Sequence, residues 1–287
     1  MYATVMHAPG DVRYEQVPDP KIEKPTDAII KLSATCICGS DLWPYRGISE
    51  QAGPAHMGHE YCGVVIEVGS EVKTVRPGQF VVGSFCLSDN TCVICASGFQ
   101  SSCVHREFMT GAQAPYARVP LADGTLVATA EMPDADMIPH MLATSDVLGT
   151  GWYAAVAAEV RKGGTAVVVG DGAVGLMGVL AASQLGAERI IAMSRHPSRQ
   201  KLAREFGATD IVAERGAEGI ARVLDLTDGV GAESVRRFLP DLMDRVLKGR
   251  IEPGKVFDLT LPLAEVAEGY KAMDERRAIK TMLRVDA

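Results

Sequence analysis

The stretch Thr165-Ala-Val-Val-Val-Gly-Asp-Gly-Ala-Val-Gly175 joins a run of mostly β-branched residues to three spaced glycines. An apolar, helix-like run follows it to about Leu185. Between a strand and a helix, the Gly-x-Gly-x-x-Gly spacing lets the backbone approach a pyrophosphate at the helix N-terminus. A glycine-rich turn that binds no ligand is the alternative. The stretch predicts a doubly wound α/β domain whose cofactor contacts are Gly170, Gly172, Ala173, Val174 and Gly175.

The predicted second strand of this domain, Arg189–Met193, ends without an acidic residue. An NAD site normally carries Asp or Glu there, because a carboxylate holds the ribose 2′-hydroxyl. Here Ser194 and Arg195 follow, so the strand end has no carboxylate to repel a 2′-phosphate and has a guanidinium to meet one. An exposed, solvated arginine is the alternative. The charge favours NADP over NAD as the cofactor.

The second half of the domain is missing from the strand pattern. A complete dinucleotide fold has six strands in two halves. After the third predicted strand, residues 209–212, strand-like character returns only at residues 256–260 and 279–285. The first strand, Thr165–Val169, would then keep an open edge without charge or proline to guard it. We therefore expect a homo-oligomer in which a second copy covers this edge.

Length and composition bound the other possibilities. The chain has 287 residues, enough for two domains, and 47% of them are hydrophobic, so a sizeable core is expected. The formal charge of −7 argues against a nucleic-acid partner and favours a small-molecule substrate. No apolar run reaches the roughly 18 residues of a membrane span, and residues 1–20 lack a signal pattern. We expect a cytoplasmic protein whose seven cysteines stay reduced.

The span 38–60 holds Cys-Gly-Ser-Asp at its start and Gly-His-Glu at its end. Zinc takes sulfur, nitrogen and oxygen ligands, and a catalytic site uses three from the protein and leaves one position open. A metal-bound histidine usually donates its other N–H to a carboxylate, which fixes its tautomer, and Asp41 is suited to that role. Ser40 could then pass a proton beside the open position. A buried cysteine and an ordinary loop histidine are the alternative for Cys38 and His59 taken singly. The joint pattern favours a metal site.

A second cluster follows downstream, with Cys92, Cys95 and Cys103 as its thiols. Paired thiolates at the Cys-x-x-Cys spacing can wrap one metal ion. Three buried free cysteines are the alternative. A third thiol close by favours the metal.

The motifs Cys-Gly-Ser-Asp and Gly-His-Glu together resemble the zinc-dependent medium-chain alcohol dehydrogenases, and the resemblance runs, with one large gap, along nearly the whole chain. It implies that Cys38 and His59 ligate catalytic zinc and that Glu60 is a reserve ligand or supports the ligands from behind. The third family ligand falls on Asp146. Alone, Asp146 reads as the N-cap of the apolar helical run after it, and it could hardly serve fully as both.

Many members of this family carry a four-cysteine structural zinc lobe, and the last three of its positions match the thiol cluster. The first position falls on Asp89, which departs from the family. Because zinc accepts carboxylate oxygen, we expect a site of Asp89, Cys92, Cys95 and Cys103. Cys86 and His105 are weaker substitutes for the missing cysteine.

The resemblance also implies the fold. We expect a β-rich, GroES-like catalytic domain formed by 1–146 and 251–287. A truncated doubly wound (Rossmann-type) cofactor domain, 147–250, would be inserted in it. Compared with the family, the missing half is deleted near Ser234-Val235.

The implied activity is reversible oxidation of an alcohol to an aldehyde or ketone. Zinc would polarise the substrate oxygen, Ser40 would take the proton, and hydride would pass to the nicotinamide. Trp43 replaces a family histidine that continues the proton relay, and Phe85 falls where relatives line the substrate pocket. Both predict a bulky apolar wall, with a structural aromatic as the alternative. The rival function is a zinc-stabilised nucleotide-binding protein whose hydride site was lost with the missing strands.

Overall fold

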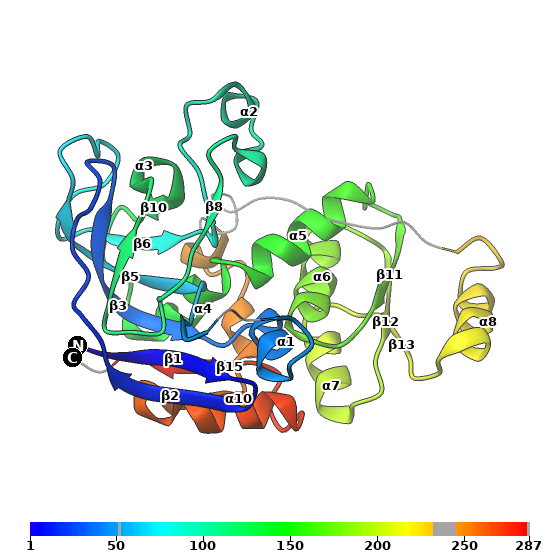
Figure 1. The fold of residues 1–287 in the computed structure, drawn as a ribbon. Helices are drawn as coiled ribbons and strands as arrows, with labels where there is room; N and C mark the ends of the chain where they lie inside the picture. Colours follow the sequence, from blue (N-terminus) through cyan, green and yellow to red (C-terminus); the bar gives the residue numbers. More distant parts are fainter. Residues whose placement is uncertain (51–52, 232–244, 286–287) are drawn as a thin grey trace. The chain divides into compact units, whose positions relative to one another are not determined.

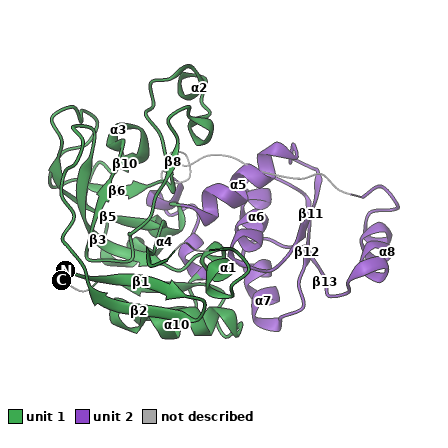
Figure 2. Cartoon of the chain, viewed as in Figure 1, with its two compact units in different colours: residues 1–145, 257–287 green, residues 146–256 purple. Residues whose placement is uncertain are grey.

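The structure, a computed structural model, describes residues 1–50, 53–231 and 245–285. The chain divides into two compact units, coloured separately in Figure 2. The first unit is Met1–Ser145 with Phe257–Ala287, and the second is Asp146–Val256. The sequence predicted 1–146 with 251–287 for the catalytic domain and 147–250 for the cofactor domain.

A seven-stranded mixed sheet forms the core of the first unit (Figure 1). Apolar side chains from its strands are buried together, among them Ile30 and Tyr61 at 0% exposure. The C-terminal strand pairs antiparallel with the long third strand, with Met282 opposite Cys36. The order across the sheet is β10 (Leu126–Ala128), β6 (Phe80–Gly83), β5 (Tyr61–Val68), β3 (Ala28–Cys36), β15 (Thr281–Arg284) and β14 (Leu259–Pro262), and β9 (Tyr116–Val119) also pairs with β3.

Two small sheets and several short helices complete the first unit. The sheets are β2-β1-β4, from Asp11–Gln16, Tyr2–Ala8 and Ala55–His56, and β7-β8, from Cys86–Leu87 and Glu107–Phe108. The helices and 3-10 turns are η1 (Gly39–Asp41), α1 (Leu42–Tyr45), α2 (Val93–Ala96), η2 (Gln100–Ser102), α3 (Ala122–Thr125), η3 (Ala135–Met137), α4 (Ile138–Ala143), η5 (Leu263–Glu265) and α10 (Val266–Asp274).

The second unit has a parallel three-stranded sheet in the order β11-β12-β13. These strands are Thr165–Val169, Arg189–Met193 and Asp210–Val212, and the first two agree with the predicted boundaries. Val169 lies opposite Met193, so the glycine loop and the residue after β12 meet at one end of the sheet. The helices that lie wholly within the described residues are α5 (Val147–Ala157), α6 (Ala173–Gln184), α7 (Pro197–Glu205) and α8 (Gly216–Leu226), with η4 at Pro253–Val256.

The edge of β11 is open in the part of the chain that the structure describes. There β11 pairs only with β12. Val169, at the end of β11, is 72% exposed. No helix among the described residues is both long and apolar enough to cross a membrane.

One strand prediction was wrong in where the strand begins. The strand expected over residues 256–260 begins only at Leu259, after the 3-10 turn at Pro253–Val256.

The predicted deletion point, Ser234-Val235, lies outside the described residues. The apolar residues of 235–248 follow helical spacing and predict a helix there, and most of that range also lies outside the described residues.

Candidate active site

Four side chains that carry sulfur, nitrogen and oxygen donors lie together, and we call them the mixed ligand group. One ligand atom from each member lies within 4.8 Å of the others. The set combines a thiol, an imidazole and two carboxylates, which is the donor chemistry that zinc accepts. The residues therefore fit the implied metal. The members are Cys38, His59, Glu60 and Asp146.

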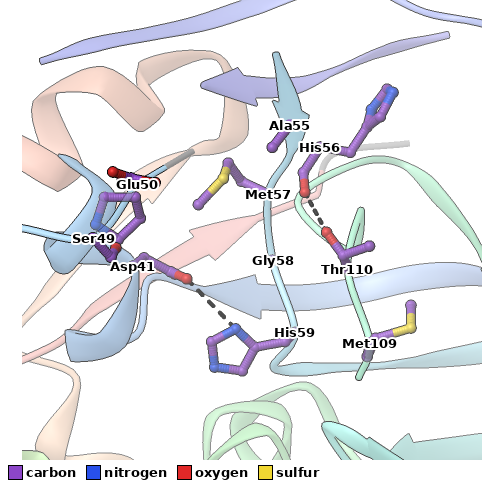
Figure 3. A pocket seen from close by; sticks show the side chains of 11 residues that line it. Asp41, Ser49, Glu50, Ala55, His56, Met57, Gly58, His59, Met109 and Thr110 are labelled. Atoms are coloured by element: carbon purple, nitrogen blue, oxygen red, sulfur yellow. Dashed lines mark hydrogen bonds and ion pairs between the residues drawn. The ribbon is translucent and has the colours of Figure 1, made fainter. Parts of the chain in front are cut away.

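Asp41 connects Cys38 and His59. Its Oδ2 accepts the backbone N–H of Cys38 at 2.9 Å, and its Oδ1 lies 3.5 Å from Nδ1 of His59 (Figure 3). Asp41 is buried, at 6% exposure, so its carboxylate is held in one orientation. A carboxylate beside Nδ1 leaves Nε2 of the imidazole for a metal.

Gly58 fixes the backbone that carries His59. It has φ +102°, and a Cβ there would stand 2.4 Å from the backbone nitrogen of Gln113. Only glycine tolerates both that conformation and that approach. The neighbouring backbone closes through hydrogen bonds from Ala112 to the Gly58 carbonyl at 3.0 Å and from Gln113 to the Met57 carbonyl at 2.9 Å.

Asp146 occupies the N-cap position of α5, but its side chain caps no backbone N–H of the helix. Its Oδ1 accepts a hydrogen bond from the Thr150 hydroxyl at 2.7 Å. The carboxylate is oriented by that hydroxyl and belongs to the ligand group. Of the two readings that the sequence left open, this geometry favours ligation over capping.

Lys280 is a member of the site that the sequence reasoning missed. Its Nζ lies 2.6 Å from Oε1 of Glu60, and the two side chains are 1% and 0% exposed. Burial alone lowers the pKa of Lys280, but Cys36 and Glu60 raise it well above its ordinary value. The buried ion pair keeps Lys280 cationic, and it fixes one carboxylate oxygen of Glu60 in place. The only signal in the sequence was a lysine next to an apolar C-terminal run.

A cavity of about 270 Å³ opens beside Asp41 and His59 (Figure 3). Its other polar lining includes Glu50, His56 and Thr110, with the Thr110 hydroxyl donating to the His56 carbonyl. The cavity wall is therefore mixed in polarity.

The residues predicted to pass the proton and to line the substrate pocket are Ser40, Trp43 and Phe85. Ser40 is exposed, and Trp43 is 58% exposed on α1. Phe85 meets the His59 ring edge-on, with the ring centroids 6.1 Å apart. Neither aromatic lines the cavity beside His59.

The second ligand group gathers the four predicted residues of the structural lobe, again within 4.8 Å: Asp89, Cys92, Cys95 and Cys103. The sulfurs of Cys92 and Cys103 are 4.0 Å apart. Two sulfurs that each lie about 2.3 Å from one ion can be at most about 4.6 Å apart, so this spacing fits zinc.

Hydrogen bonds hold Asp89 in that group. Oδ1 accepts the N–H groups of Thr91 and Cys92 at 2.9 and 3.0 Å, and Oδ2 lies 2.6 Å from Nδ1 of His105. The His105 contact and these backbone bonds lower the pKa of Asp89. His105 thus contacts the carboxylate, while Cys86 lies outside the group.

Thiol acidity differs within the lobe. Backbone N–H donation, from Cys95 first, lowers the pKa of Cys92 to about 7. Burial raises the pKa of Cys95 to about 12. Metal binding would therefore have to remove a proton from Cys95 that the metal-free lobe retains at neutral pH.

The glycine loop has the form that a pyrophosphate requires. Gly170 has φ +115°, and a Cβ on Gly175 would stand 2.2 Å from the Gly170 carbonyl oxygen. Gly172 is the N-cap of α6, and a Cβ there would meet no atom within 4 Å, so a ligand can approach the backbone at this point. Ala173 and Val174 form the first turn of α6, and Val174 is 40% exposed.

A carboxylate from the glycine loop lies beside the end of β12. Oδ2 of Asp171, from the glycine loop, accepts the hydroxyl of Ser194 at 3.0 Å. Nη1 of Arg199 lies 3.4 Å from Oδ1 of the same side chain. The expectation that no carboxylate stands here is therefore wrong, because the sheet brings the loop beside the strand end. Arg195 itself is exposed.

Comparisons with known proteins match both units. The model of the alcohol dehydrogenase GroES-like domain matches residues 24–134, and the zinc-binding dehydrogenase model matches residues 173–248. A zinc-type alcohol dehydrogenase B of Aspergillus flavus is 37% identical over 82% of this chain, which spans 57% of that protein's length.

Two further relatives extend the match. A medium chain reductase/dehydrogenase of Acremonium sp. is 35% identical, over 82% of this chain and 84% of its own length. An alcohol dehydrogenase structure from Thermus sp. ATN1 superposes with a TM-score of 0.86, at 26% identity, over 99% of each chain.

Proposed function

The chain belongs to the zinc-dependent medium-chain alcohol dehydrogenase family, and from that premise we propose that it interconverts an alcohol and an aldehyde or ketone. One observation carries the proposal. The side chains of Cys38, His59 and Asp146 offer sulfur, nitrogen and oxygen atoms to one point, and Asp41 stands behind His59. Three mixed ligands with an oriented histidine are the form of a catalytic, not a structural, zinc site.

The chain's own residues have separable tasks in this reaction. Cys38, His59 and Asp146 would hold zinc, and Asp41 would keep the His59 ring turned toward it. When bound, zinc polarises the substrate oxygen, and the nicotinamide accepts or returns the hydride. We assign to Ser40 the task of accepting the proton of the substrate hydroxyl. Ser40 is exposed beside Asp41, so it can pass a proton on to solvent.

NADP is the cofactor that we propose, with Arg195 as the group that meets the 2′-phosphate. The exposure of Arg195 directly after Ser194, at the end of β12, supports this assignment. Arg195→Asp should reverse the order of affinity, because it exchanges attraction for repulsion at that phosphate. Fluorescence titration of both reduced cofactors measures it. Tighter binding of NADH than NADPH by the unmodified protein would overturn the proposal.

We also propose a structural zinc held by Asp89, Cys92, Cys95 and Cys103, supported by the 4.0 Å spacing of two sulfurs and by the orientation of Asp89. The reduced thiols that both metal sites need suit the cytoplasm, where we place the protein. The open edge of β11 supports assembly with a second copy of the chain.

The rival is a zinc-stabilised nucleotide-binding protein without dehydrogenase activity. The three-stranded sheet of the described second unit favours it, because a complete cofactor fold has six strands. The two differ in turnover, not in binding.

A coupled assay distinguishes the two functions. Zinc-loaded protein should reduce NADP with at least one member of a panel of primary and secondary alcohols. Cys38→Ser should abolish that activity, while Cys62→Ser, a buried thiol on β5 outside both ligand groups, should retain it. NADPH binding without turnover on any alcohol would establish the rival.

A further inference from the structure

The buried carboxylate of Asp171 is the feature of the second unit that the proposed roles leave unexplained. Asp171 lies between two glycines of the cofactor loop and is 9% exposed. A charged side chain is rarely buried unless hydrogen bonds and opposite charge stabilise it. It lies in the glycine loop that is proposed to bind the dinucleotide, so its charge would affect cofactor binding.

Its contacts join the loop to the end of β12. Oδ2 accepts the hydroxyl of Ser194 at 3.0 Å, and Ser194 is 1% exposed. Arg199, on α7, reaches both the Asp171 carboxylate and its backbone carbonyl at 3.4 Å. Burial by itself raises the pKa of Asp171. The hydrogen bond from Ser194 and the charge of Arg199 together lower it by more, so the pKa lies below its ordinary value and the carboxylate is ionised at neutral pH.

That location has a known meaning in dinucleotide folds. The acid that selects NAD stands at the end of the second strand, where it bonds to the ribose 2′-hydroxyl. In this chain that strand ends in Ser194 and Arg195, but the Asp171 carboxylate lies one hydrogen bond away from Ser194. An adenosine ribose that binds at this strand end would meet an acid supplied by the loop instead of by the strand.

We propose that Asp171 is a specificity-determining residue that limits the preference for NADP. Its carboxylate replaces the absent strand-end acid, so it supports a ribose hydroxyl and opposes a 2′-phosphate. Arg199 offsets part of its charge, and Arg195 supplies the attraction for the phosphate. The chain should consequently bind both cofactors, with a narrower margin than Arg195 alone would give. This inference rests on the proposed use of a nicotinamide cofactor.

Direct binding tests the assignment without any turnover. Affinities for NADPH and NADH are measured by fluorescence titration, and those for 2′,5′-ADP and 5′-AMP by calorimetry. Asp171→Asn keeps the shape and can still accept the Ser194 hydroxyl, but it removes the charge. The ratio of NADPH to NADH affinity should rise roughly tenfold, the scale expected for one charge near a phosphate. The ratio for 2′,5′-ADP over 5′-AMP should rise with it.

Arg199→Gln tests the same idea with the opposite sign. Removing the charge that offsets Asp171 should lower the ratio of NADPH to NADH affinity. The matched control is Asp210→Asn, because Asp210 also pairs with an arginine, Arg189, at 3.5 Å, but at the opposite end of the parallel strands. Its ratio should equal that of the unmodified protein.

The outcomes separate this inference from the proposed function. A merely structural Asp171 would weaken both cofactors equally and leave the ratio unchanged within about twofold, which would overturn the inference alone. Binding of neither dinucleotide by the unmodified protein would overturn the cofactor proposal together with the inference.

Discussion

At the residue scale, one buried carboxylate, Asp41, connects two residues of the proposed metal site. It accepts the Cys38 N–H at 2.9 Å with one oxygen and faces His59 at 3.5 Å with the other. Both ligands therefore depend on the same rigid group. The spacing of the motif gives this arrangement, since η1 turns the chain between Cys38 and Asp41.

His59→Ala should reduce the zinc content by one ion per chain. The variant removes the only nitrogen ligand of the mixed group but leaves the lobe untouched. Metal analysis by mass spectrometry measures the content. His7→Ala, which removes an imidazole paired with Glu15, is the control and should keep the full content. Equal zinc in both variants would contradict the assignment.

Lys280→Met should destabilise the fold by about 3–5 kcal/mol, because it leaves the Glu60 charge buried without its cation. Denaturant unfolding of the zinc-loaded protein measures the free energy. Lys271→Met breaks an exposed pair with Glu275 at 3.9 Å and should cost less than about 1 kcal/mol. A similar small loss at both positions would show that the buried pair is unimportant for stability.

At the element scale, the lobe around α2 and η2 is the segment that the proposed structural zinc would order. Exposed Val93 and Phe99 show that the lobe buries little apolar surface of its own. A ligated ion would therefore supply much of its order.

Asp89→Ala should release the lobe's zinc and loosen that element alone. The change removes one ligand and the acceptor of two backbone N–H groups. We expect faster amide hydrogen exchange across residues 89–103 and about one zinc fewer per chain. Asp89→Cys restores a sulfur ligand and should recover the metal. Slow exchange in the alanine variant would mean that packing, not zinc, orders the lobe.

At the scale of the whole molecule, the open edge of β11 predicts self-association. Within the described ranges β11 pairs on one side only, with β12, and Val169 at its end is 72% exposed, so the strand can pair with another chain. Light scattering at micromolar concentration should give at least a dimer mass.

Val169→Lys should weaken that assembly, because a charge at an exposed strand end opposes edge pairing. Val230→Lys is the control, since Val230 is 87% exposed and lies outside the sheet. A monomer mass for the unmodified protein would contradict the predicted self-association.

The sequence by itself determined the local chemistry. Most of the residues that the structure gathers at each site could be predicted from three local patterns. These are the spacing of Cys38 and His59, the thiol cluster and the glycine loop. These signals are readable because ligand types at short spacing, or glycines after a strand, are constraints within one segment. The boundaries of β11 and β12 followed for the same reason, from continuous apolar runs.

Only the tertiary structure decided the contacts between distant segments. Glu60 meets Lys280 across 220 residues because β15 returns to pair with β3. Asp171 reaches Ser194 because β11 and β12 run parallel in register. The Asp146 side chain accepts the Thr150 hydroxyl and caps no backbone N–H of α5, which favours the predicted ligation over helix capping. Strand pairing sets which side chains meet, and that pairing depends on packing that no single segment encodes.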